Sequence, residues 1–224
     1  MAKGLVSDWS QTTTPKGDVM GIVTAHMSMS VDGYVAGPNA GAGNPLGDEG
    51  VSIQQWMFDL ASFREIQALT GGQTNKDDEE LRERFAPTGA VVMGRRMFDE
   101  GEDPWGDNPP YHMPVFVVTH EARDRLVKDG GTTFTFVTDG IESALEQAKA
   151  AAGDKNVNIA GGADTVQQFI KAGLLDELEI HLAPLLFGQG IRLFDRMGPE
   201  HIELENIRVV ASPRVTHLRF RIVK

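Results

Sequence analysis

Hydrophobic positions along the chain predict short apolar strands alternating with helices. Runs of this kind, rich in apolar and β-branched residues, occupy Gly21–Val31, Ala90–Met93, Val115–Thr119, Phe134–Thr138 and Val157–Ala160. Short continuous apolar strands are typical of a parallel sheet that is covered on both faces. The pattern therefore predicts an α/β fold with a mixed, mostly parallel central sheet.

Helical periodicity fills most of the gaps between these strands. Helices are expected at Ser52–Leu69, Glu79–Phe85, Ile141–Ala152 and Asp164–Ala172. In the first of these, apolar residues near one face recur at Ile53, Trp56, Met57, Leu60, Phe63 and Ile66.

Two longer strands are predicted at Glu177–Leu186 and Arg214–Val223 with no helix between them, and we expect them to pair antiparallel. Val35–Gly50 is a Gly/Pro/Asn-rich loop, long enough to be functional, and Glu102–Pro114 is a second loop rich in Pro and Gly. Residues 1–18 are expected to be a flexible leader, and residues 19–224 a single domain.

Composition narrows the function classes. The net charge of −11 argues against a general binder of nucleic acid or membrane surfaces. The absence of cysteine excludes disulfides and thiolate metal sites and fits a cytoplasmic protein. A few local cations and helix N-termini can still hold an anionic cofactor in so acidic a chain.

Candidate ligand-binding residues follow the predicted strands, where open α/β sheets bind ligands. Gly161-Gly162 precedes a helix whose free N–H groups suit a diphosphate, although such a pair also serves ordinary turns. Arg95 and Arg96 could clamp a phosphate, or could lie in a solvated loop. No GxGxxG opens a helix after the first strand, and no GxxxxGK[ST] occurs.

Other chemistries find less support. The six histidines show no metal-ligand spacing, and His26, His181 and His217 are interpreted as structural because they lie in strands. No GxSxG motif indicates a hydrolase. A nucleotide-utilising transferase would need carboxylates for Mg²⁺, for which Asp32, Asp139 and Asp164 are scattered candidates.

Four segments in this order resemble the dihydrofolate reductase superfamily. They are Ser30-Val31-Asp32-Gly33, Val92-Met93-Gly94-Arg95 with Arg96, Ile159-Ala160-Gly161-Gly162, and the tail from Leu175-Asp176-Glu177-Leu178 through Ala183–Gly190. The chain is most similar to the branch of the reductase domain of the bifunctional riboflavin-biosynthesis deaminase/reductase, over Ile22–Val223. The resemblance implies a dihydrofolate-reductase-like three-layer α/β/α domain.

The resemblance also implies NADPH as cofactor and a hydride transfer to a C=N or C=O carbon of a small heterocycle. Met27 and Ser28 would line the nicotinamide, Gly94, Arg95 and Arg96 the phosphates, Thr119 and His120 the adenosine, and Gly161, Gly162, Ala163, Asp164 and Thr165 the diphosphate. It further implies a homodimer and a cis Gly161–Gly162 bond.

The substrate side is less defined. Asp32 is the candidate proton donor, with a turn-forming role or water as alternatives, and Trp56 is either part of the substrate floor or of the core. Dihydrofolate reductases carry a carboxylate one turn before the Trp, where this chain has Ile53, Gln54 and Gln55, so folate reduction is not favoured. A nucleotide-binding protein without catalysis on the same fold is the other alternative.

Overall fold

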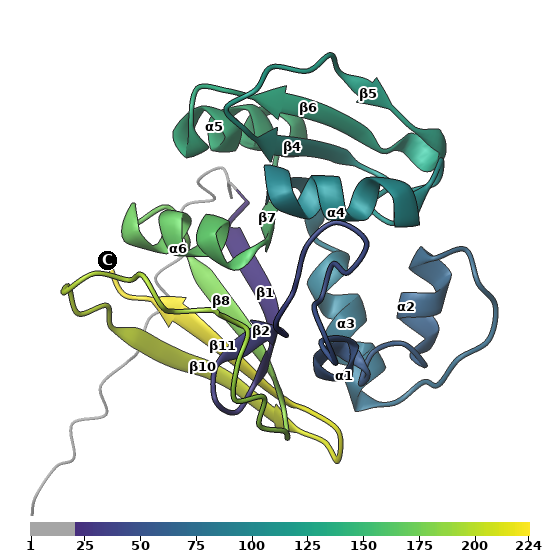
Figure 1. Cartoon of the computed structure of the whole chain (residues 1–224), viewed down its shortest axis with the longest axis vertical. Coiled ribbons are helices and arrows are strands. Elements are labelled where there is room, and N and C mark those ends of the chain that lie inside the picture. The colour runs from purple at the N-terminus through teal and green to yellow at the C-terminus, as the bar shows by residue number, and fades with distance from the viewer. Residues whose placement is uncertain (1–20) are drawn as a thin grey trace, which may run out of the picture.

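The computed structural model describes residues 21–224, and a nine-stranded sheet forms its centre (Figure 1). The strands of this sheet are β1 (Val23–Ser30), β3 (Thr88–Gly94), β4 (Pro114–Val118), β5 (Leu126–Val127), β6 (Thr133–Val137), β7 (Asn156–Gly161), β8 (Glu177–Ala183), β10 (Leu204–Ala211) and β11 (Thr216–Ile222). Their order is β10-β11-β8-β1-β7-β3-β4-β6-β5.

The sheet is mixed and mostly parallel, as predicted. Each neighbouring pair from β8 to β6 in that order is parallel. The strands β11, β10 and β5 pair antiparallel with their neighbours. The predicted antiparallel pairing of the C-terminal strands is confirmed by the β8–β11 ladder. The predicted leader, residues 1–18, lies outside the described residues.

Helices cover both faces of the sheet, which gives the expected three layers. Helices α5 (Ile141–Ala152) and α6 (Ala163–Lys171) lie on one face, and α3 (Lys76–Phe85) and α4 (Arg95–Trp105) lie on the other (Figure 1). Along β3 the buried side chains alternate between these layers. Val92 joins the core with α5 and α6, whereas Val91 and Met93 pack with Phe98 of α4.

The predicted helix Ser52–Leu69 is wrong in its continuity. The segment forms two short helices, α1 (Val51–Gln54) and α2 (Ala61–Ile66). Between them Leu60 has extended backbone angles and forms a bridge with Gln73. The apolar face is real, since Trp56 and Leu60 are buried, but the backbone bonds with residue 73 interrupt the helix.

The predicted loop Glu102–Pro114 is also partly wrong, because α4 continues to Trp105. Two i,i+4 ion pairs on α4 join Arg95 to Asp99 and Arg96 to Glu100. A side chain at Gly101 would lie 2.2 Å from the ring of Trp105, so this glycine serves close packing rather than a helix end.

Smaller elements extend the prediction. Asn75 caps α3 by accepting a hydrogen bond from Asp78 N, so the helix begins at Lys76, three residues before the expected start. Strands β2 (Tyr34–Ala36) and β9 (Ile191–Arg192) pair antiparallel in a separate two-stranded sheet. A 3₁₀ turn, η1 (Asp129–Gly131), precedes β6. No helix within residues 21–224 is both long enough and apolar enough to cross a bilayer.

Candidate functional site

A cleft of about 980 Å³ lies at the carboxyl ends of the parallel strands. Its walls come from β1, β3, β4 and β7, from the length of α4 and the first turns of α6, and from the loop 35–50 and the segment 190–196. Helix α4 begins directly after Gly94, and α6 directly after Gly162. Two helix N-termini therefore open into one cleft, where their free N–H groups favour an anionic ligand.

Ten of the residues predicted to hold the cofactor line this cleft. They are Met27, Gly94, Arg95, Arg96, Thr119, His120, Gly162, Ala163, Asp164 and Thr165. The sequence placed them in four separate segments, and the parallel sheet brings those segments to one edge. The grouping supports the predicted ligand site, while the part that each residue takes in binding stays a prediction.

Glycines keep the floor of the cleft open. The Gly161–Gly162 peptide bond is cis, as the resemblance implied. A side chain at Gly162 would meet nothing within 4 Å. At Gly94 a Cβ would lie 2.4 Å from Thr165 Oγ1, so this position joins α4 and α6 closely. The glycine-lined floor and the two helix ends fit an extended dinucleotide.

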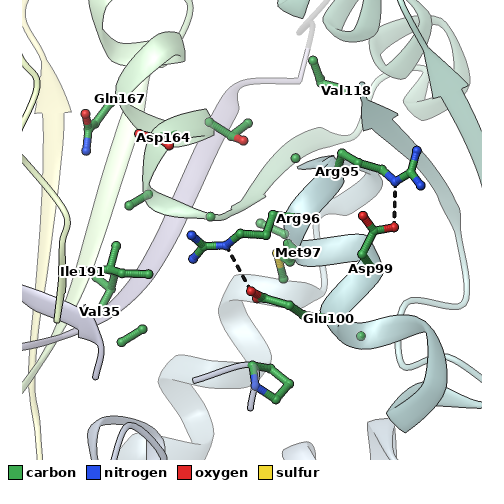
Figure 2. A pocket seen from close by; sticks show the side chains of 18 of the residues that line it. Val35, Arg95, Arg96, Met97, Asp99, Glu100, Val118, Asp164, Gln167 and Ile191 are labelled. Carbon is green, nitrogen blue, oxygen red and sulfur yellow. Dashed lines mark hydrogen bonds and ion pairs between the residues drawn. The ribbon is translucent and has the colours of Figure 1, made fainter. Parts of the chain in front are cut away.

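The two arginines of α4 point in opposite directions (Figure 2). Arg95 Nε lies 2.6 Å from Asp99 Oδ1, and Arg95 Nη1 lies 3.5 Å from Thr119 Oγ1 and 3.7 Å from Glu121 Oε2. Arg96 extends toward Val35 and Ile191, and its Nε lies 3.0 Å from Glu100 Oε1. Any phosphate bound here therefore competes with carboxylates for both guanidinium groups.

The structure does not bring Asp32 into the cleft. Its carboxylate accepts hydrogen bonds from Ser30 Oγ at 2.6 Å and from the backbone N–H groups of Phe187 and Gly188 at 3.0 and 2.7 Å. The Ser30 bond, together with these backbone bonds, lowers the pKa of Asp32 to about 2. An acid held ionised in this way is a poor proton donor, so the predicted catalytic role gives way to the turn-forming alternative.

Trp56, Ser28 and Gly161 also lie off the lining of the cleft. Trp56 is 2% exposed, and its Nε1 donates to Ser28 Oγ at 3.1 Å. Its ring lies against the imidazoles of His181 and His217, at centroid distances of 4.9 and 5.1 Å. Trp56 therefore belongs to the core, and its predicted contact with substrate is not supported.

Beneath Trp56 lies a group of buried polar side chains between α3 and the sheet, here named the buried histidine cluster. Its members are Asp77, Glu179, His181 and His217, which are buried, and His26 and Arg84, which are half-buried. Arg84 Nη1 lies 2.6 Å from His181 Nε2, His181 Nδ1 lies 2.7 Å from His217 Nδ1, and His217 Nε2 lies 3.1 Å from Asp77 Oδ1. Arginine can only donate, so the chain of bonds runs from Arg84 to Asp77.

Charge and burial set the ionisation of this cluster. Burial lowers the pKa of His26 to about 4 and that of Arg84 to about 10. Burial opposes ionisation of Glu179, but His26, whose Nδ1 lies 3.4 Å from Glu179 Oε2, and the nearby arginines lower the pKa of Glu179 to about 2. The cluster also contains three residues whose potential metal-ligand atoms lie within 4.8 Å of one another, namely His26, Glu179 and His181. The Arg84 guanidinium already bonds His181, however, and its positive charge opposes a bound cation.

Several residues that line the cleft were not predicted from the sequence as site residues. They are Pro45, Leu46, Gln54, Glu100, Arg192, Asp195 and Arg196. The predicted functional loop Val35–Gly50 contributes the first two, so its length and composition were a usable signal. The segment after β9 gave no comparable signal, because its position depends on the short β2–β9 sheet and on the bond from Gln167 Nε2 to Leu193 O at 2.8 Å.

Comparison with known proteins gives the family. The family described as RibD C-terminal domain matches residues 22–218. Riboflavin biosynthesis protein RibD of Bacillus amyloliquefaciens is 33% identical over 99 residues, which are 44% of this chain and 24% of that protein.

Two solved structures share the fold. A protein provisionally assigned to riboflavin biosynthesis, from Shewanella sp. PV-4, has a TM-score of 0.63 and 22% identity, covering 91% of this chain and 99% of that one. Dihydrofolate reductase from Enterococcus faecalis, complexed with NADP(H), has a TM-score of 0.52 and 13% identity over 92% of this chain and 98% of that one. With the family match over residues 22–218, the chain belongs to the RibD C-terminal domain family.

Proposed function

We propose that this protein is an NADPH-dependent reductase of the riboflavin type, which reduces a C=N or C=O carbon of a small heterocycle. The observation that supports this best is the cleft itself, in which the N-termini of α4 and α6 and the side chain of Arg95 lie together at the sheet edge of a RibD C-terminal domain. The nicotinamide would supply the hydride, and the protein positions the reactants and excludes water.

The adenosine end of the cofactor is proposed to lie beside Thr119 and His120, with its 2′-phosphate near Arg95. Arg95 is held by Asp99 and approaches Thr119 and Glu121, so its guanidinium is already oriented. The diphosphate would meet the N–H groups at the start of α6, and the nicotinamide would lie over Met27. A Cβ placed on Gly161 would lie within 3.9 Å of both Met27 and Met97, so these side chains meet at that point.

The first experiment tests binding and turnover. NADPH titrated calorimetrically is expected to bind, and its absorbance is expected to fall when an aminopyrimidine or aminouracil substrate is added. Binding without oxidation across such substrates would favour the non-catalytic alternative. A Mg²⁺-dependent transferase is not favoured, because Asp32, Asp139 and Asp164 form no group of three ligands within residues 21–224.

Cofactor choice is the second test. One charge-assisted bond to a 2′-phosphate contributes about 1.5–3 kcal/mol, so NADPH should bind about tenfold or more tightly than NADH. The double variant Arg95→Ala, Arg96→Ala should weaken NADPH far more than NADH. Equal loss for both cofactors would mean that these arginines do not contact the 2′-phosphate.

Folate reduction is not proposed. At the positions where a carboxylate would hold a pterin, Ile53 is buried and Gln54 lines the cleft with an amide.

A homodimer in the cytoplasm is proposed, with the exposed apolar side chains of Leu204 and Val209 on the edge strand β10 available for contact. Light scattering should give twice the mass of the chain, and a monomer at micromolar concentration would contradict it.

A further inference from the structure

Glu100 is the acidic side chain of the cleft whose environment differs most from that of a solvated carboxylate. It lies on α4 among the cleft-lining residues, and its side chain is 10% exposed. Its Oε1 is shielded from solvent and accepts no hydrogen bond, although Arg96 Nε is 3.0 Å away. A carboxyl oxygen buried without a hydrogen bond costs free energy unless a ligand or a proton occupies it.

The place of Glu100 on the helix puts it beside the proposed hydride-transfer site. Residues three and four apart on a helix share a face, so Glu100 lies next to Met97 and Arg96. Met97 is one of the two methionines that meet below Gly161. Figure 2 shows Arg96 and Glu100 together on the side of α4 that faces Val35 and Ile191. Asp99 points the other way, toward Arg95.

The charges around Glu100 leave Arg96 as its main counterion. Strands β3 and β4, on which α4 packs, contain no charged residue. Across the cleft the charged groups are paired with one another, Arg196 with Asp164 at 3.6 Å and Arg192 with Asp195 at 3.9 Å. Asp99 is a nearby negative charge on the same helix. Burial, opposed by Arg96 and assisted by Asp99, raises the pKa of Glu100.

We propose that Glu100 is the proton donor of the reduction, and that Arg96 stabilises the carboxylate left behind. In the step, hydride from C4 of NADPH forms a C–H bond at the C=N carbon. The Glu100 carboxyl proton forms the N–H bond, which leaves NADP⁺ and the Glu100 carboxylate. Solvent entering the open cleft then returns a proton. The preferred substrate is thus a cyclic imine or amidine whose basic nitrogen faces α4.

This proposal rests on the proposed function, and it has a consequence that needs no substrate. The phosphates of a bound dinucleotide bring negative charge into the cleft and compete for Arg96, and both effects favour protonation of Glu100. Cofactor binding should therefore be accompanied by proton uptake. NADP⁺ is the suitable probe, because it withstands mildly acidic solution.

The experiment is a calorimetric titration with NADP⁺ at pH 6 in two buffers that differ in ionisation enthalpy. The 2′-phosphate has its own pKa of about 6, so the informative quantity is the difference between wild type and Glu100→Gln. Glu100→Gln should lose part of the proton uptake, whereas Glu102→Gln should keep it, because Glu102 lies on the same helix but pairs with Arg123 away from the cleft lining. Equal uptake in wild type and Glu100→Gln would overturn the proposal while leaving the cofactor site intact. If NADP⁺ and NADPH do not bind at all, both the proposed function and this inference fail.

Kinetics give a second readout once a substrate is turned over. Glu100→Gln should lower kcat/KM by about 10²- to 10⁴-fold at neutral pH. It should also abolish the decrease in activity that deprotonation of Glu100 causes as the pH rises. Glu100→Asp should recover part of the rate with a shifted pH profile. A Glu100→Gln enzyme with an unchanged profile and a rate within a few fold of wild type would overturn the proposal. Unfolding curves of both variants check that the fold is kept.

Discussion

The cleft and the buried histidine cluster lie in the same domain, and both contain several ionisable groups, but they use charge differently. In the cleft the side chain of Arg96 is 59% exposed, and its guanidinium lies beside the carboxylate of Glu100. In the cluster Arg84 is half-buried and joined to a chain of imidazoles that ends at Asp77. The exposed arginine of the cleft can exchange its carboxylate partner for a phosphate of a ligand. Arg84 in the cluster cannot exchange its partners without loss of the fold.

This difference shows why a cluster of histidines and carboxylates is not sufficient evidence for a functional site. The buried histidine cluster has the stronger pKa shifts, since His26, Glu179 and Arg84 all depart clearly from their usual values. Yet most of its groups bond one another, and the small cavity beside it is about 50 Å³. The cleft has weaker shifts but a volume of about 980 Å³ and two helix N-termini.

The largest expected effect comes from breaking the cluster at Arg84. Arg84→Met should lower the free energy of unfolding by about 3–5 kcal/mol, because it leaves buried Glu179 and His181 without that cation. Arg95→Met in the cleft is the matched control, and it should change stability by about 0.5 kcal/mol or less because its partner Asp99 is exposed. Urea unfolding measures both. Similar losses for the two variants would show that the contrast between the regions is mistaken.

The pH dependence of stability tests the same contrast at His26. Because burial lowers its pKa from 6.5 to about 4, the unfolded chain binds more protons than the folded one between these values. Stability should therefore fall by roughly 3 kcal/mol from this group as the pH drops from 6.5 to 4. The lowered pKa of His181 acts in the same direction. Unfolding free energies of wild type and His26→Gln across this window measure it, and parallel curves would count against it.

A smaller effect is expected from crowding the cleft at Gly94. Gly94→Ala places a methyl group 2.4 Å from Thr165 Oγ1, so either the Thr165 side chain must rotate or the start of α6 must shift. Overpacking of this kind costs about 1–3 kcal/mol, which corresponds to about tenfold or greater weakening of NADPH binding if the cost falls on the binding geometry. Calorimetry should show recovery in the double variant Gly94→Ala, Thr165→Ala. Unchanged NADPH affinity in Gly94→Ala would place the cofactor elsewhere.

The smallest effect on the cleft is expected from Asp32→Asn. The substitution weakens the bonds to Phe187 and Gly188 and should lower the thermal midpoint. Because Asp32 does not line the cleft, NADPH affinity and the pH profile of turnover should stay as in wild type. Turnover that disappears in Asp32→Asn, with the fold intact by circular dichroism, would restore Asp32 as proton donor and remove Glu100 from that role.

The sequence by itself determined the α/β class, most strands and much of the lining of the cleft. Apolar runs such as Val115–Thr119 are local signals, and residues such as Arg95 and Gly162 directly follow strands, so parallel pairing was enough to bring them together. Only the tertiary structure decided the rest. Leu60 interrupts a helical pattern through a bridge with Gln73, and Trp56 joined the core by packing against His181.

Glu100 is a second residue whose environment only the tertiary structure decided. Its place in the sequence, within a helix that continues through Gly101, gave no sign of function. Its environment depends on Arg96 one turn before it and on the shielding of Oε1 within the folded chain. The i,i+4 spacing from Arg96 is local, but burial depends on contacts between distant segments, so periodicity and local motifs do not contain it.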